Sequence, residues 1–202
     1  TPSSFARIVD EKPQDVSAGD AINGIQDRTL NKIEYDVDNI VTLSNDKEFT
    51  LQKGTYVIDF SAPAYIALNT NAWLWSVTDN KKVLQGSTEY GNNSTGMSTT
   101  HSKGRYTVTL TEAHTYKIQH YFNNANGKLG NVCKSGVGIF TTVDIQKVGT
   151  GVSGGGSYTP ENMVWSGDLS PSTANERLPE TVYTNNNDVP LYVQLYTAST
   201  AN

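Results

Sequence analysis

The chain has 202 residues, a formal net charge of −5 and a single cysteine, Cys133. This length suits one domain with a small appendage, and the acidic balance without a basic stripe argues against nucleic acid as a partner. The lone cysteine excludes an intrachain disulfide, and the lack of any run of 18 apolar residues argues against membrane insertion.

Strands are expected at residues 5–9, 33–37 and 40–43, and Ile33, Tyr35 and Val37 alternate with polar residues. Residues 10–20 are polar and are expected to form a loop, in which Asp10 and Glu11 would be solvated. Residues 21–31 fit either a short strand or one helical turn, and extended chain is the preferred interpretation.

The best-specified stretch runs from Glu48 to Tyr65 and predicts two strands joined by a turn at Lys53-Gly54. Period-two alternation of aromatic and β-branched residues is typical of strands that are buried on one face. The side chains expected inside are Phe49, Leu51, Tyr56, Ile58 and Phe60.

Further along the chain, residues 73–77, 83–84, 106–110 and 116–122 are expected to be strands. Residues 87–103 are almost wholly polar and predict the longest exposed loop of the domain. Loops of this length in compact domains are usually functional or disordered.

The last strand of the domain is expected at residues 137–148, with Val143 on one face together with Val137, Ile139 and Ile145. Phe140 and Val148 would then lie on the opposite, outer face. Apolar residues on both faces of a strand indicate cover on both faces, and a second subunit is the simplest cover.

Domain boundaries follow from composition. Residues 1–148 predict one β domain, and the glycine-rich residues 149–157 predict a flexible linker. Residues 158–202 predict a short β-hairpin appendage or the start of a further domain.

Tests for chemistry find no catalytic, cofactor or metal constellation in the sequence. His101, His114 and His120 lack metal-ligand spacing, and no G-x-S-x-G nucleophile motif occurs. Asp36 and Asp38 lack the ligand count of a calcium loop, so solvated turn acids are the preferred interpretation.

A mixture of aromatic and polar residues is the positive signal. Tyr90, Asn92, Asn93 and His101 belong to the expected loop, and Trp73 lies near it. Aromatic, amide and hydroxyl groups suit adaptable recognition of a sugar or a protein surface. These five residues are the candidate receptor-binding set, with core packing as the alternative for Trp73 and Trp75.

Short motifs resemble C1q/TNF-like jelly rolls, and their surroundings resemble the C1q-like knobs of bacteriophage tail fibres, tail needles and related virion appendages. The resemblance covers roughly residues 5–148 and is carried by residues 5–12, 28–31, 40–43, 49–51, 54–56 and 61–65. It implies an all-β jelly-roll β-sandwich and a homotrimer.

The function that this resemblance implies is a non-enzymatic, extracellular virion knob that binds a host-cell-surface glycan or protein, or caps the fibre beside other appendage proteins. Two alternatives stay open, a structural capsid or fibre decoration without a receptor and a tail-spike glycan depolymerase.

Overall fold

Every regular element is a strand in the residues that this computed structural model describes, which are 3–91, 98–123 and 127–148. The expected linker at 149–157 and the expected appendage at 158–202 lie outside these residues. No helix in the described part of the chain could cross a membrane. The strands are β1 (Ser4–Lys12), β2 (Gly24–Asp27), β3 (Lys32–Asp36), β4 (Val41–Ser44), β5 (Glu48–Leu51), β6 (Gly54–Tyr65), β7 (Asn69–Ser76), β8 (Lys81–Tyr90), β9 (Thr99–Leu110), β10 (His114–Phe122) and β11 (Gly138–Val148).

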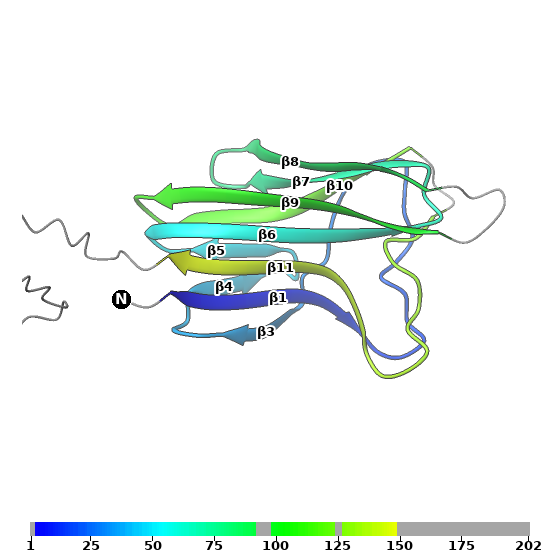
Figure 1. Cartoon of the computed structure of the whole chain (residues 1–202), viewed down its shortest axis with the longest axis horizontal. Helices are drawn as coiled ribbons and strands as arrows, with labels where there is room; N and C mark the ends of the chain where they lie inside the picture. Colours follow the sequence, from blue (N-terminus) through cyan, green and yellow to red (C-terminus); the bar gives the residue numbers. More distant parts are fainter. Residues whose placement is uncertain (1–2, 92–97, 124–126, 149–202) are drawn as a thin grey trace, which may run out of the picture. The chain divides into compact units, whose positions relative to one another are not determined.

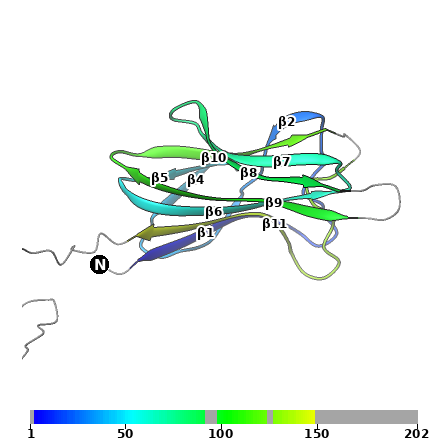
Figure 2. The ribbon, with the colours of Figure 1, turned by 45° about the horizontal axis from the view of Figure 1, so that its top comes forward.

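The strands form two antiparallel sheets that pack face to face (Figure 1). One sheet has the order β3-β1-β11-β6-β9 and the other β4-β5-β10-β7-β8, with β2 paired to the end of β10 (Figure 2). Between consecutive strands the chain crosses from one sheet to the other, except in the hairpins β4–β5 and β7–β8. This strand order is that of a jelly roll, so the predicted all-β jelly-roll sandwich is confirmed.

The core between the sheets is built by the predicted alternation. Phe49, Leu51, Tyr56 and Ile58 are 0% exposed and Phe60 is 3% exposed. The intervening residues of β6, from Thr55 to Ser61, are only partly buried because they face outward. The register expected for this stretch is therefore confirmed.

The faces of β11 differ from the prediction. Val9 of β1 pairs with Thr142, but Glu11 pairs with Ile139, so β11 carries one extra residue at a bulge. A bulge turns the following side chains to the other face. Phe140 is consequently buried at 8% exposure while Ile139 is 38% exposed, and the predicted outer position of Phe140 is wrong.

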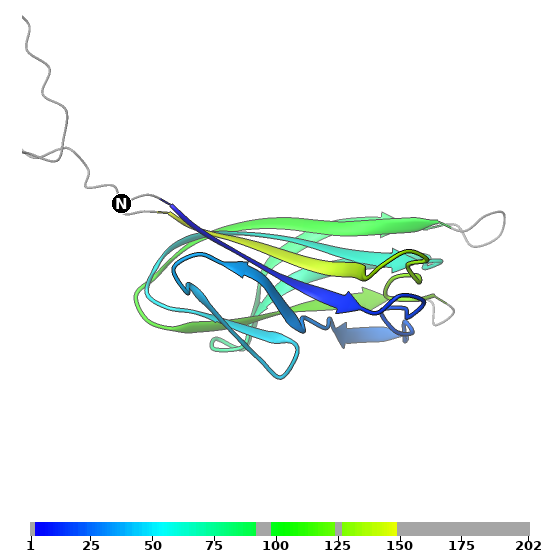
Figure 3. The ribbon, with the colours of Figure 1, turned by 90° about the horizontal axis from the view of Figure 1, so that it is seen from below.

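The two ends of the sandwich differ in character. β1 begins beside the end of β11, where Ser4 pairs with Lys147 (Figure 3). The connections β1–β2 and β6–β7 and the described part of β10–β11 gather at the opposite end, where β8 ends and β9 begins (Figure 1). This opposite end is called the distal end below. A second small apolar cluster lies there, consisting of Ala18, Ala21, Ala64, Ala67, Phe122, Leu129 and Phe140.

Candidate binding surface

The histidines do not form a reactive centre. His101 Nδ1 lies 3.2 Å from Ser61 Oγ, and His114 Nε2 lies 3.4 Å from Asp79 Oδ1. His120 is fully buried, and neither of its ring nitrogens has a hydrogen-bond partner. No cluster of three or more His, Cys, Asp or Glu residues in the described ranges is placed to hold a metal ion.

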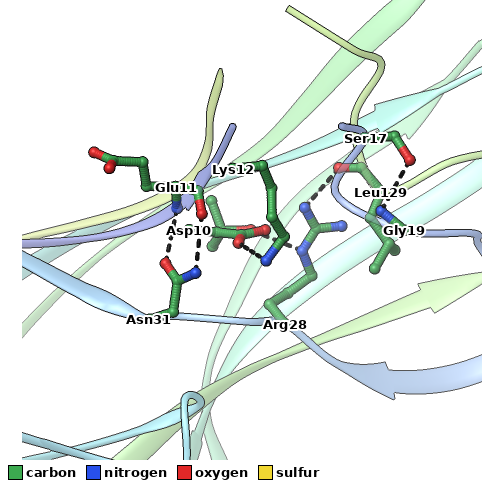
Figure 4. Close-up of polar contacts among 9 residues, drawn as sticks. Asp10, Glu11, Lys12, Ser17, Gly19, Arg28, Asn31 and Leu129 are labelled. Atoms are coloured by element: carbon green, nitrogen blue, oxygen red, sulfur yellow. Dashed lines mark hydrogen bonds and ion pairs between the residues drawn. The ribbon is translucent and has the colours of Figure 1, made fainter. Parts of the chain in front are cut away.

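A buried polar cluster joins the two sheets near the distal end (Figure 4). The guanidinium of Arg28 is fully buried and donates to Thr141 Oγ1 at 2.8 Å, Pro63 O at 3.1 Å and Leu129 O at 2.6 Å. Three acceptors from separate segments satisfy this cation, so it holds those segments together. Arg28 belongs to the short motif at residues 28–31, and this contact set gives that motif a structural role.

Asp10 corrects the expectation of a solvated loop acid. β1 continues to Lys12, so Asp10 lies within the strand and is 1% exposed. Its Oδ1 forms an ion pair with Lys12 Nζ at 2.6 Å. Burial raises the pKa of Asp10, while Lys12 and Arg28 act in the opposite direction. The pair stabilises the interior and offers no exposed carboxylate for chemistry.

The expected long loop at residues 87–103 is largely strand, which corrects the prediction. β8 extends to Tyr90 and β9 begins at Thr99, because backbone pairing continues to Asn69↔Tyr90 and Tyr65↔Thr99. Asn92 and Asn93 lie outside the described residues. Polarity alone misled the prediction, since edge strands with one solvated face are also polar.

Tyr90 and His101 lie on different sheets. Tyr90 ends β8 at the distal end and is 65% exposed. His101 is paired with Pro63 on the outer face of the five-stranded sheet. Burial is the main cause that lowers the pKa of His101, and the nearby charge of Lys103 also lowers it. The Tyr90 side chain therefore presents an exposed aromatic surface, whereas the His101 ring lies within hydrogen-bonding distance of Ser61 Oγ.

Trp73 is 5% exposed, but it does not belong to the core between the sheets. Its neighbours Ala72 and Leu74 point inward, so Trp73 and Trp75 point to the outer face of the six-stranded sheet. Trp73 therefore lies in a strand, as expected, and is buried on the outer face rather than in the core between the sheets. Alternation of small and large residues in β7 was the only signal of this outcome.

A chain of hydrogen bonds fixes the Trp73 indole from three strands. Trp73 Nε1 donates to Gln119 Oε1 at 3.0 Å, and Gln119 Nε2 donates to Asp27 Oδ1 at 3.0 Å. Lys117 Nζ donates to the other oxygen of Asp27, also at 3.0 Å. The ring is thus held in one orientation on an otherwise flat sheet face.

The outer face of the five-stranded sheet is dominated by paired charges. Arg105 makes two hydrogen bonds to Asp59, at 2.7 and 2.9 Å. Arg7 bridges Glu34 at 3.0 Å and Asp144 at 3.5 Å. A shallow hollow of about 430 Å³ lies over part of this row, and its lining includes Asp59, Arg105, Asp144, Ser61, Lys103 and Thr142.

Beside the charged row, near the edge of the sheet, three apolar residues remain exposed. Phe5 faces outward from β1, Tyr35 lies opposite Arg7, and the Val37 amide bonds to the Phe5 carbonyl. Their exposed fractions are between 46 and 53%. These three residues are called the β1–β3 apolar patch below.

Comparison with known proteins finds similarity in solved structures only. No family model matches the sequence. No curated protein matches it either. The chain is similar to murine APRIL at pH 5.0, with a TM-score of 0.47, 8% identity and coverage of 73% of this chain and all of that one.

Two further solved structures are similar over the same share of this chain. The globular domain of zebrafish complement 1qA has a TM-score of 0.46, 15% identity and 96% of its chain covered. Eiger TNF from S. frugiperda has a TM-score of 0.45, 8% identity and 94% of its chain covered. The fold assignment follows from the strand order of the two sheets rather than from these similarities.

Proposed function

We propose that this chain is the non-enzymatic knob of a bacteriophage tail fibre, tail needle or related virion appendage, assembled as a homotrimer. It binds a glycan or protein on the host cell surface. The jelly-roll strand order supports this proposal, together with the short motifs that resemble such knobs. The observation that carries it is that the first residues of β1 and the last residues of β11 lie at the end of the sandwich opposite the distal end.

One end holds the first residues of β1, the last residues of β11 and the β5–β6 and β9–β10 turns, and the distal end holds the β1–β2 and β6–β7 connections (Figure 1). A knob attached through the first end directs its distal end towards a target. Loop residues change without disturbing the paired strands, so specificity varies while the scaffold stays constant. Tyr90 is the most exposed large hydrophobic side chain among the described residues.

The direct test is competition for adsorption. The purified 202-residue chain is added to host cells before the virus that carries it, and adsorbed particles are counted. We expect dose-dependent inhibition, because the free knob occupies the receptor. Tyr90→Ala should raise the chain concentration needed for half-maximal inhibition by about tenfold. This is the loss of affinity expected when one aromatic side chain is removed from an interface.

Thr111→Ala is the matched control, since Thr111 is exposed at the opposite end, in the β9–β10 turn. It should inhibit as the unmodified chain does. If the unmodified chain fails to inhibit adsorption at saturating concentration, the receptor-binding proposal is wrong, and a structural decoration becomes the better interpretation.

A further inference from the structure

The side chain of Lys82 lies over the face of the Trp73 indole. The ammonium nitrogen of Lys82 lies 3.9 Å from the centre of the indole ring, and Lys82 itself is exposed. A cation–π contact at an exposed site is weak, and a lysine side chain changes rotamer easily. The cover over the aromatic face is therefore displaceable, whereas the indole edge is held by Gln119.

An irregularity in the pairing of β8 with β7 brings Lys82 to its position over the Trp73 ring. Leu74 pairs with Leu84, but Trp75 pairs with Lys82, so Val83 is an extra residue in β8. In a regular strand, residues three apart face opposite sides. The bulge instead brings Lys82 and Gln85 onto the same outer face, where Lys82 Nζ donates to Gln85 Oε1 at 2.7 Å. Bulges of this kind re-aim side chains and are enriched next to functional sites.

Lys82 differs from its neighbours in its charge environment. Lys117 is paired with Asp27, and Lys81 lies 3.7 Å from an Asp79 carboxylate oxygen. Among the described residues, Lys82 forms no ion pair and has only a neutral amide oxygen as acceptor. The outer face of the six-stranded sheet thus combines the oriented Trp73 indole with the Lys82 ammonium group, which has no carboxylate partner among the described residues.

From this combination we infer that the outer face around Trp73 binds an acidic sugar residue of a glycan. Lys82 swings off the ring and donates to the sugar carboxylate, exchanging a cation–π contact for a stronger charge-assisted hydrogen bond. The apolar C–H face of the pyranose then stacks on the uncovered indole. Gln85 Oε1, freed from Lys82, accepts a hydrogen bond from a sugar hydroxyl group, while Gln85 Nε2 keeps Ala72 O as its acceptor.

This inference rests on the proposed function only in placing that glycan on a host cell. The surface is a strand face of the six-stranded sheet and is separate from the Tyr90 end of β8, so the two contacts are testable independently.

The experiment is calorimetric titration of the full chain with oligosaccharides of galacturonic, glucuronic and N-acetylneuraminic acid, and with the carboxyl-reduced forms of the same oligosaccharides. We expect saturable binding of at least one acidic probe and at least tenfold weaker binding of its reduced form. Indole N–H signals in NMR spectra, assigned with Trp73→Phe, should show Trp73 shifting during the titration.

Lys82→Ala should weaken binding of that probe at least tenfold. Lys81→Ala removes the same charge one residue away and should change binding less than twofold. Absence of saturable binding to all three acidic probes overturns the inference, as does equal binding by the Lys82→Ala and unmodified chains.

Adsorption measurements separate this inference from the proposed function. A chain that binds an acidic probe through Lys82 but never inhibits adsorption supports the sugar site and contradicts the proposed function. A chain that inhibits adsorption but binds no acidic probe supports the proposed function and overturns the sugar site.

Discussion

At the scale of single residues, His120 is a buried base whose protonation opposes folding. Its ring packs against Phe122 at 4.3 Å between centroids, and burial, with a smaller contribution from Arg28, lowers its pKa to about 2. The unfolded chain has the ordinary pKa near 6.5. Between these two pH values His120 is protonated in the unfolded chain but not in the folded one. The free energy of unfolding therefore has its full value above pH 6.5 and falls as the pH decreases below it.

We predict that His120→Leu removes this part of the acid sensitivity. At pH 7 its free energy of unfolding should stay within about 1 kcal/mol of the original, because two unpartnered nitrogens disappear with the ring. Between pH 7 and pH 5 the original chain should lose about 2 kcal/mol more than the variant. Urea unfolding at both pH values measures the difference.

Phe122→Leu is the control, since it alters the same contact without a titrating group. It should destabilise by a similar amount at both pH values, roughly 1–2 kcal/mol. Equal losses for the original chain and His120→Leu on acidification would contradict the assignment of acid sensitivity to His120.

At the scale of elements, two glycines allow the backbone to approach the Phe140 ring closely. Gly130 lies in the β10–β11 connection, and Gly138 is the first residue of β11. A Cβ placed on Gly130 would lie 2.3 Å from Phe140 Cδ1, and one on Gly138 would lie 2.9 Å from the same ring. Such distances are excluded, so Phe140 can be buried by the bulge only because both positions are glycine.

We predict that Gly130→Ala destabilises the chain by about 1–3 kcal/mol, because Phe140 has to leave its site. Combined with Phe140→Leu, the loss should be at least about 1 kcal/mol smaller than the sum of the single losses. Denaturant unfolding of the three variants forms the double-mutant cycle.

Gly136→Ala is the comparison, because a Cβ there meets no atom within 4 Å and only its φ of 72° opposes the substitution. The free energy of unfolding lost in Gly136→Ala should simply add to the loss in Phe140→Leu, with no coupling between the two substitutions. Additive losses for Gly130→Ala and Phe140→Leu would show that the close approach is not the cause.

At the scale of the whole molecule, the β1–β3 apolar patch replaces Phe140 as the candidate contact between subunits. Phe5, Tyr35 and Val37 expose large apolar surface beside a row of alternating charges on one sheet. A surface with both signs of charge can complement a second copy of itself. The proposed homotrimer is therefore expected to bury this patch.

We predict that light scattering gives about three times the 22.0 kDa mass of one chain. The double substitution Phe5→Ser and Tyr35→Ser should shift this mass towards the monomer, since loss of buried aromatic surface weakens association. Tyr121→Ser, an exposed aromatic on the other sheet, should leave the mass unchanged. A monomeric original chain at concentrations well above micromolar would contradict the trimer.

The sequence by itself determined the elements whose signal is local. Alternation from Phe49 to Phe60 specified both strands and the face that each buries, because side chains in a strand alternate strictly between two faces. The same regularity placed β1, β3 and β10 within a few residues of their observed bounds. Tyr90 as an exposed aromatic also followed from its polar surroundings.

Only the tertiary structure decided the features that depend on partners distant in sequence. The bulge opposite Val9 moved Phe140 inside, and the continued pairing of β8 and β9 replaced the expected long loop. The three acceptors of Arg28 are distant in sequence, and the farthest, Thr141, is 113 residues away. The outward position of Trp73 under Lys82 likewise depends on how β8 pairs with β7. Periodicity within one segment carries no information on such pairings, because an extra residue or a distant acceptor changes a side chain's environment without changing its own sequence neighbours.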